Sequence, residues 1–98
     1  MRNVRFSKKA RRDLDAICRY IARDNPSAAA TVLEDVYRVC SLIGENPRLG
    51  RLRADAGENV RYFPISNLNI FYAVKGRDVH VVRVLHGRRG LWRALHYD

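Results

Sequence analysis

The sequence predicts an α+β fold in the order β-α-α-β-β-β, with an antiparallel helical hairpin packed on a curved, mostly antiparallel sheet. Apolar residues recur every three or four positions in two successive segments between residues 8 and 44, which is the periodicity of amphipathic helices. Three short runs between residues 59 and 85 then alternate apolar and polar positions or carry β-branched residues, which is typical of strands in a sheet.

A short strand over residues 3–6 and a first helix are predicted to open the fold. Ser7 follows the strand and is a good N-cap, because its hydroxyl oxygen can accept a hydrogen bond from a free backbone N–H. The helix begins at Lys8, and its apolar stripe consists of Ala10, Leu14, Ile17 and Ile21. Asn25-Pro26 ends this helix, because the residue before a proline is pushed out of the α region.

The second helix is predicted to begin at the same dipeptide, with Asn25 as its cap and Pro26 in its first turn. Its apolar face is formed by Val32, Leu33, Val36, Val39, Cys40 and Ile43. Gly44 and Asn46-Pro47 end the helix. Two helices joined by so short a turn run antiparallel, and their two apolar faces need a shared platform, which the following strands can provide.

Three strands are predicted after a charged loop, over residues 59–65, 68–74 and 79–85. Gly76, in the turn between the last two, can take the positive φ that a tight hairpin turn needs. Sequential strands with short connections are antiparallel neighbours by default. Pro64 lies late in the first of the three strands and has no N–H to donate, so we expect an edge position or a bulge there.

Length and composition indicate one ordinary globular domain over residues 1–98. The chain is 47% hydrophobic and 30% charged, which excludes a disordered tail. No stretch approaches the roughly 20 apolar residues that a membrane span requires. The first seven residues have no apolar run after their charges, so we expect no signal peptide, a cytoplasmic location and no membrane partner.

The charge balance is strongly basic, with nineteen Lys and Arg against ten Asp and Glu and a formal net charge of +9. Such an excess attracts nucleic acid or an acidic protein, or is a basic surface with no dedicated role. Cys18 and Cys40 fall within the predicted helices and are expected to be buried core thiols. They and the three scattered histidines match no ligand spacing, so we expect no metal and no cofactor.

The exit of the last strand carries a polar and basic cluster that a small domain does not need in order to fold. Its members are Arg83, His86, Arg88, Arg89, Trp92 and Arg93. An anionic or acidic partner is therefore expected there. Structural alternatives remain open, since Arg83 can pair with an acidic residue of the fold and His86 can bond the backbone where the strand ends. Residues 91–95 are predicted to form one helical turn that packs back on the body.

Four segments of the chain, in order and at these spacings, resemble the RelE/ParE superfamily of bacterial toxins from type II toxin–antitoxin pairs. The first helix of ParE-type toxins is similar to Leu14-Asp15-Ala16-Ile17 with Tyr20-Ile21-Ala22. The loop after their second helix is similar to Asn46-Pro47-Arg48-Leu49-Gly50-Arg51. Their last two strands are similar to Ile70-Phe71-Tyr72-Ala73-Val74 and Val82-Arg83-Val84-Leu85-His86-Gly87-Arg88-Arg89. The chain is therefore identified as a ParE-like member, and the resemblance implies the RelE/ParE-like fold.

The resemblance implies one of two activities. ParE-like members poison DNA gyrase as binding modules and need no catalytic residues, whereas RelE-like members are ribosome-dependent mRNA endoribonucleases. For a nuclease, the candidate set is Arg61, Arg83 and His86, with arginines to hold a phosphate and an imidazole as acid or base. However, Gly87 stands where several nuclease relatives carry a tyrosine, and the Glu that some use as a base on the second sheet strand is missing. Gyrase inhibition is the favoured prediction and the endoribonuclease is the alternative. A member without potent toxicity is a third hypothesis.

The resemblance also implies a cognate antitoxin that is ParD-like, acidic and DNA-binding, in a hetero-oligomeric toxin–antitoxin complex. A charge of +9 suits an acidic chain, whose helix can lie along the helical hairpin while a strand adds to a sheet edge. We expect antitoxin contacts from Tyr20, Arg23 and Arg61. Contacts with the target, DNA gyrase, are expected from Arg83, His86, Arg88, Arg89, Trp92 and Arg93.

Overall fold

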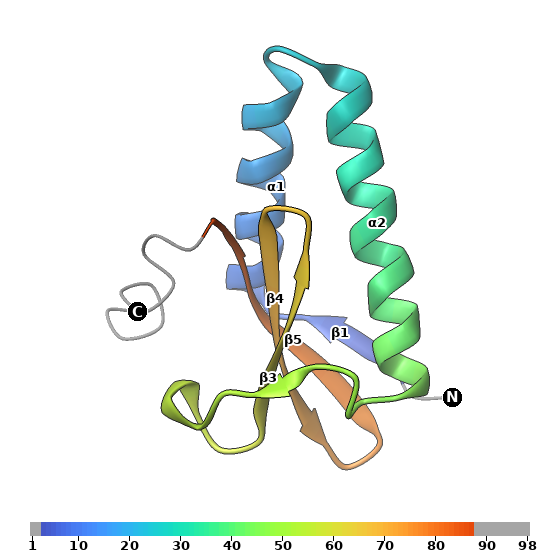
Figure 1. Ribbon diagram of the computed structural model, residues 1–98, viewed down its shortest axis with the longest axis vertical. Helices are drawn as coiled ribbons and strands as arrows, with labels where there is room; N and C mark the ends of the chain where they lie inside the picture. Colours follow the sequence, from blue (N-terminus) through green and yellow to red (C-terminus); the bar gives the residue numbers. More distant parts are fainter. Residues whose placement is uncertain (1–2, 88–98) are drawn as a thin grey trace.

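The computed structural model describes residues 3–87 and confirms the predicted α+β fold (Figure 1). The helices are α1 (Lys8–Ala22) and α2 (Pro26–Glu45), which form the antiparallel hairpin. The strands are β1 (Val4–Phe6), β2 (Arg51–Leu52), β3 (Val60–Ile65), β4 (Leu68–Lys75) and β5 (Asp78–His86). A short 3-10 helix, η1 (Ala54–Ala56), lies between β2 and β3. Within residues 3–87, neither helix has the length and apolar character that crossing a membrane would take.

The five strands form one sheet in the order β1-β5-β4-β3-β2. The two predicted hairpins, β3–β4 and β4–β5, are confirmed as antiparallel. β1 joins β5 in parallel, with Val4 opposite Val79, which makes the sheet mixed at one edge. β2 was not predicted, because its two residues are too few to show any periodicity; it pairs Arg51 with Tyr62 at the other edge.

Pro64 lies on an edge of the sheet, which is one of the two alternatives predicted for it, an edge position or a bulge. The register of β2 against β3 ends at Tyr62, so within the described residues the outer side of β3 has no strand beside Pro64. A residue without an N–H loses no ladder bond at such a position. The irregularity of the sheet lies elsewhere, between Phe71 and Tyr72 in the pairing of β4 with β5.

The main core fills the space between the helical hairpin and the sheet. The helices contribute the buried residues Ala10, Leu14, Val36, Val39, Cys40 and Ile43, which confirms much of both predicted stripes. Cys18 departs from its prediction, since it is half-buried. It lies at the border of the α1 stripe, where the helix faces a surface groove. A second, smaller cluster lies around the buried residues Val60, Phe71 and Ala73.

Ser7 connects the first helix to the sheet through both functions of its hydroxyl group. Its Oγ accepts a hydrogen bond from the Ala10 N–H at 3.0 Å, which confirms the predicted N-cap. The same Oγ donates to the backbone oxygen of Val82 at 2.9 Å, and the Ser7 N–H donates to Val81 O at 2.9 Å. The start of α1 is therefore fixed against β5.

We predict that Ser7→Ala lowers the free energy of unfolding by about 2 kcal/mol. Loss of the cap costs about 1 kcal/mol, and the part-buried Val82 carbonyl that loses its donor costs about 1 kcal/mol more. The matched control is Asn25→Ala, which removes the exposed cap of α2, bonded to Ala28 N–H, and should cost about 1 kcal/mol. Urea unfolding of both variants measures the difference. Equal losses would contradict a second role for Ser7.

Candidate functional site

Arg83 is held inside the fold by Asp13 of α1. Its Nε donates to Asp13 Oδ2 at 2.7 Å, and its Nη2 donates to Oδ1 at 3.0 Å. Both side chains are only 16% exposed, and Asp13 Oδ2 also accepts the backbone N–H of Val84 at 3.0 Å. A forked arginine–carboxylate pair of this kind is strong and geometrically specific. Of the two readings that the sequence left open, the structure therefore shows the pairing with an acidic residue of the fold.

Arg61 anchors the loop that follows α2. Its Nη1 donates to the backbone oxygen of Gly50 at 2.7 Å. The neighbouring Tyr72 hydroxyl accepts from the Gly50 N–H at 2.8 Å and donates to Pro47 O at 2.7 Å. Burial raises the pKa of Tyr72, although the bond from Gly50 and the charge of Arg61 partly oppose this rise. The hydroxyl therefore stays protonated and keeps its donor role.

His86 is the last residue of β5 and is exposed. It lines a small pocket of 80 Å³ together with Ile21, Val32, Asp35 and Leu68, among others. The next residue, Gly87, has a positive φ of 74° and donates its N–H to Asn67 O at 2.6 Å. The backbone is therefore turned and fixed immediately after His86, at the point where the described part of the chain ends.

The three residues of the predicted nuclease set are thus held by different parts of the fold. Arg61 is bonded to the loop beside β3, Arg83 is bonded to α1, and His86 lines a pocket at the end of β5. The remaining predicted target contacts lie outside the described residues, as does the predicted turn over residues 91–95. These contacts are Arg88, Arg89, Trp92 and Arg93. Within residues 3–87, no group of three or more His, Cys, Asp or Glu could hold a metal ion.

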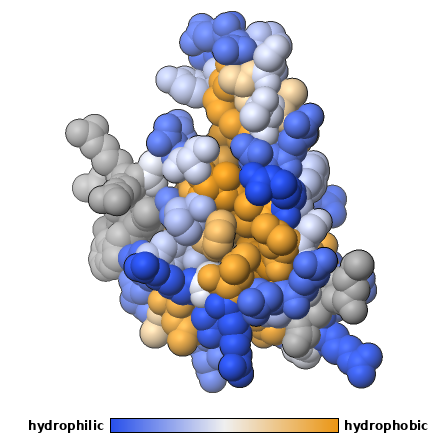
Figure 2. Space-filling view, turned by 45° about the vertical axis from the view of Figure 1, so that its right-hand side comes forward, coloured by the Kyte–Doolittle hydropathy of each residue, from blue (hydrophilic) through white to orange (hydrophobic). Residues whose placement is uncertain are grey.

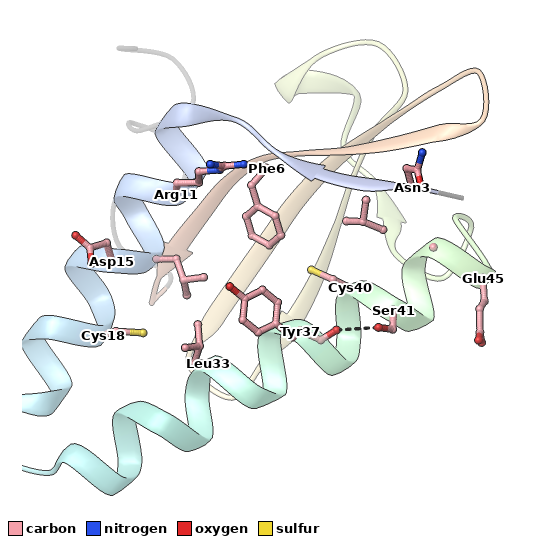
Figure 3. A pocket seen from close by; sticks show the side chains of 13 residues that line it. Asn3, Phe6, Arg11, Asp15, Cys18, Leu33, Tyr37, Cys40, Ser41 and Glu45 are labelled. Carbon is pink, nitrogen blue, oxygen red and sulfur yellow. Dashed lines mark hydrogen bonds between the residues drawn. The ribbon is translucent and has the colours of Figure 1, made fainter. Parts of the chain in front are cut away.

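A groove of 960 Å³ runs between β1, the first turns of α1 and the second half of α2. Figure 3 shows the side chains of Phe6 and Tyr37 directed toward each other across it, and their rings meet edge-on at 6.3 Å. Leu14 and Leu33 add to its apolar wall. Tyr37 is 56% exposed although it is a large aromatic residue. On the face of the molecule that Figure 2 shows, apolar side chains are gathered in a strip down the middle.

Both cysteines line this groove, and their thiol groups are not activated as nucleophiles. Burial raises the pKa of the Cys40 thiol to about 11. Burial also raises the pKa of Cys18, and the nearby carboxylate of Asp15 adds to the rise. Because the thiolate is the nucleophilic form, neither thiol is activated at neutral pH. The groove therefore offers shape and apolar surface rather than a nucleophile, and its lining includes both a cation, Arg11, and two carboxylates, Asp15 and Glu45.

Sequence reasoning missed this groove. One signal was available: Tyr37 and Gly44 share the helical spacing of Leu33 and Cys40, which widens the predicted apolar face of α2 on one side. The predicted antitoxin contacts Tyr20 and Arg23 lie elsewhere, at the end of α1 next to the turn of the hairpin. Both are exposed, and Tyr20 is 65% exposed.

Comparisons with known proteins agree over nearly the whole chain. A model of the ParE toxin of the type II toxin–antitoxin system parDE matches residues 4–91. Toxin ParE3 of Caulobacter vibrioides (strain ATCC 19089 / CIP 103742 / CB 15) is 32% identical over 80 residues, which cover 81% of this chain and 80% of that protein.

Solved structures of toxins share the fold. A chain of the chromosomal ParDE toxin–antitoxin system from P. aeruginosa superposes with a TM-score of 0.73 at 22% identity, covering 90% of this chain and 98% of that one. The isolated E. coli RelE toxin gives a TM-score of 0.66 at 19% identity, with 96% and 93% coverage. A chain of the RelBE2 complex from Mycobacterium tuberculosis gives 0.59 at 25% identity, with 87% and 90% coverage.

We predict that Asp13→Ala lowers the free energy of unfolding by about 3 kcal/mol, because it leaves the largely buried guanidinium of Arg83 without this counter-charge. Asp15→Ala is the matched control, since Asp15 belongs to the exposed pair with Arg19 on the same helix and should cost less than about 1 kcal/mol. Chemical denaturation of both variants tests this difference. A loss for Asp13→Ala as small as that for Asp15→Ala would show that the pair is unimportant for stability.

Proposed function

The chain belongs to the ParE toxin family of type II toxin–antitoxin systems, and we propose that it inhibits DNA gyrase until a cognate ParD-like antitoxin sequesters it. The observation that carries this proposal is the forked bond between Arg83 and Asp13. A guanidinium that is already hydrogen-bonded to a carboxylate of its own fold is poorly placed to hold a scissile phosphate. What the fold offers instead is shaped surface, as a protein inhibitor requires.

The groove between β1 and the helical hairpin is the proposed docking site of the antitoxin. It is mainly apolar, with an exposed aromatic side chain, Tyr37, and its lining includes one cation, Arg11, and two carboxylates, Asp15 and Glu45. An amphipathic segment matches these properties, since its apolar side chains can cover Phe6 and Tyr37 while one of its carboxylates meets Arg11. Aromatic residues in such grooves are typical centres of binding energy.

The open edge of β1 adds backbone groups to this site. Asn3 O accepts from Val79 N–H and Ser7 N–H donates to Val81 O, so every second residue of β1 turns its backbone groups toward β5. The backbone groups of Val4 and Phe6 therefore point to the outer edge. A strand of the antitoxin can pair there while its side chains reach the groove.

The first test of the proposed activity is DNA supercoiling by purified gyrase, titrated with the chain after its antitoxin has been removed. We expect supercoiling to be lost or cleavage complexes to be trapped, and activity to return when the antitoxin is added. Full supercoiling at a large excess of folded toxin would refute gyrase as the target. Cleavage of ribosome-bound mRNA would then be the activity to measure.

The proposed docking site predicts that Tyr37→Ala weakens antitoxin binding by about tenfold or more, because Tyr37 is an exposed aromatic residue in the groove. Tyr20→Ala is the matched comparison, since Tyr20 is similarly exposed but lies at the hairpin turn, where the sequence places antitoxin contacts together with Arg23. Titration calorimetry with the antitoxin measures both affinities. A larger loss for Tyr20→Ala would move the main contact from the groove to the hairpin turn.

A further inference from the structure

The loop from Pro47 to Leu52, called here the presenting loop, is built as a rigid element. The Tyr72 hydroxyl bridges Gly50 N–H and Pro47 O at 2.8 and 2.7 Å, and Arg61 holds Gly50 O at 2.7 Å. Gly50 is buried, and a Cβ at this position would lie 2.6 Å from Tyr62 O, so no larger residue fits without a shift of backbone. The loop therefore has one well-defined shape before any partner arrives.

The side chains that this rigid loop displays are of a kind that folding alone does not require. Leu49 is 39% exposed and Leu52 is 60% exposed, and both belong to the small set of large hydrophobic residues that the described part of the chain leaves in solvent. Arg48 and Arg51, which precede Leu49 and Leu52 respectively, are also exposed. A preorganised loop binds without a large loss of conformational entropy, and apolar residues beside arginines are typical of protein interfaces.

A pocket of 600 Å³ lies beside the presenting loop and has the chemistry to receive a carboxylate. The guanidinium groups of Arg48 and Arg61 line it together with the side chains of Asn46 and Asn59, and no acidic residue is among the described residues that line it. Leu52 and Val74 supply an apolar wall. Arg61 donates one N–H to Gly50 O, which leaves the rest of its fork for a ligand.

We propose that the presenting loop and this pocket form the surface that contacts the target protein, with an acidic side chain of the target in the pocket and apolar side chains on Leu49 and Leu52. Charge complementarity selects this occupant, because the pocket pairs two arginines with apolar walls rather than with a continuous basic track. The inference rests on the proposed function, since it assigns a surface to the contact with gyrase.

This surface shares no lining residue with the proposed antitoxin groove, although the two adjoin at the end of α2, where Glu45 lines the groove and Asn46 lines the pocket. The groove is lined by β1 and the presenting loop contains β2, and these two strands are the opposite edges of the sheet. Substitutions in the loop can therefore change target binding while antitoxin binding reports that the fold is intact. Arg61 is left unchanged in the test, because its substitution would also release Gly50 O.

The experiment compares inhibition of gyrase supercoiling by the wild-type chain, by Arg48→Gln and by the double variant Leu49→Ala/Leu52→Ala. Arg12→Gln and Leu42→Ala are matched controls, because Arg12 is an exposed arginine on α1 and Leu42 is 43% exposed on α2. We expect the loop variants to need about tenfold more protein for half-inhibition. The controls should inhibit like the wild type, and all variants should bind antitoxin with unchanged affinity.

Three outcomes would overturn the inference. If the wild-type chain inhibits gyrase and the loop variants inhibit equally well, the surface is wrong while the proposed function stands. If the wild-type chain leaves gyrase fully active, the proposed function itself fails. If Arg48→Gln weakens binding to duplex DNA in the absence of gyrase while the leucine variant inhibits normally, the pocket receives a nucleic-acid phosphate and not a carboxylate of a protein.

Discussion

The attachment of α1 to the outer edge of β5 is the constraint on which the rest of the structure depends. β1 pairs with β5 only up to Phe6, which lies opposite Val81. Beyond that point, side chains of the helix replace the missing strand: Ser7 Oγ donates to Val82 O, and Asp13 accepts the Val84 N–H. The edge of the central hairpin is thus satisfied without a further strand. The same contacts fix α1, and through it α2, on the sheet.

This arrangement supports the proposed role of the fold as a scaffold for binding. Arg83, the most conspicuous residue of β5, forms an ion pair with Asp13 that holds α1 and the sheet together. The surfaces that remain lie at the two edges of the sheet, with an apolar groove beside β1 and a rigid basic-apolar loop around β2. The proposals therefore assign the two partners to surfaces of different chemistry that share no lining residue.

Local patterns in the sequence were enough to predict both helices and three strands nearly to their observed ends, since each has a clear period and explicit caps or turns. The role of Arg83 could not be settled in the same way, because its partner Asp13 is 70 positions away and several acidic residues were equally plausible. The groove depends on Phe6 and Tyr37 coming together from β1 and α2. The parallel pairing of β1 and the two-residue strand β2 likewise depend on tertiary contacts that leave no periodic signal.

The distance along the chain between Ser7 and Val82 also determines when this protein can fold. The first strand and the start of the first helix find their partners 75 positions later, in β5, which is the last strand of the described residues. Contacts of such long sequence separation close late and slow the search for the native state. A growing chain that has not yet made β5 therefore cannot cover the apolar faces of α1 and α2, and we expect the groove beside β1 to form only once β5 has left the ribosome.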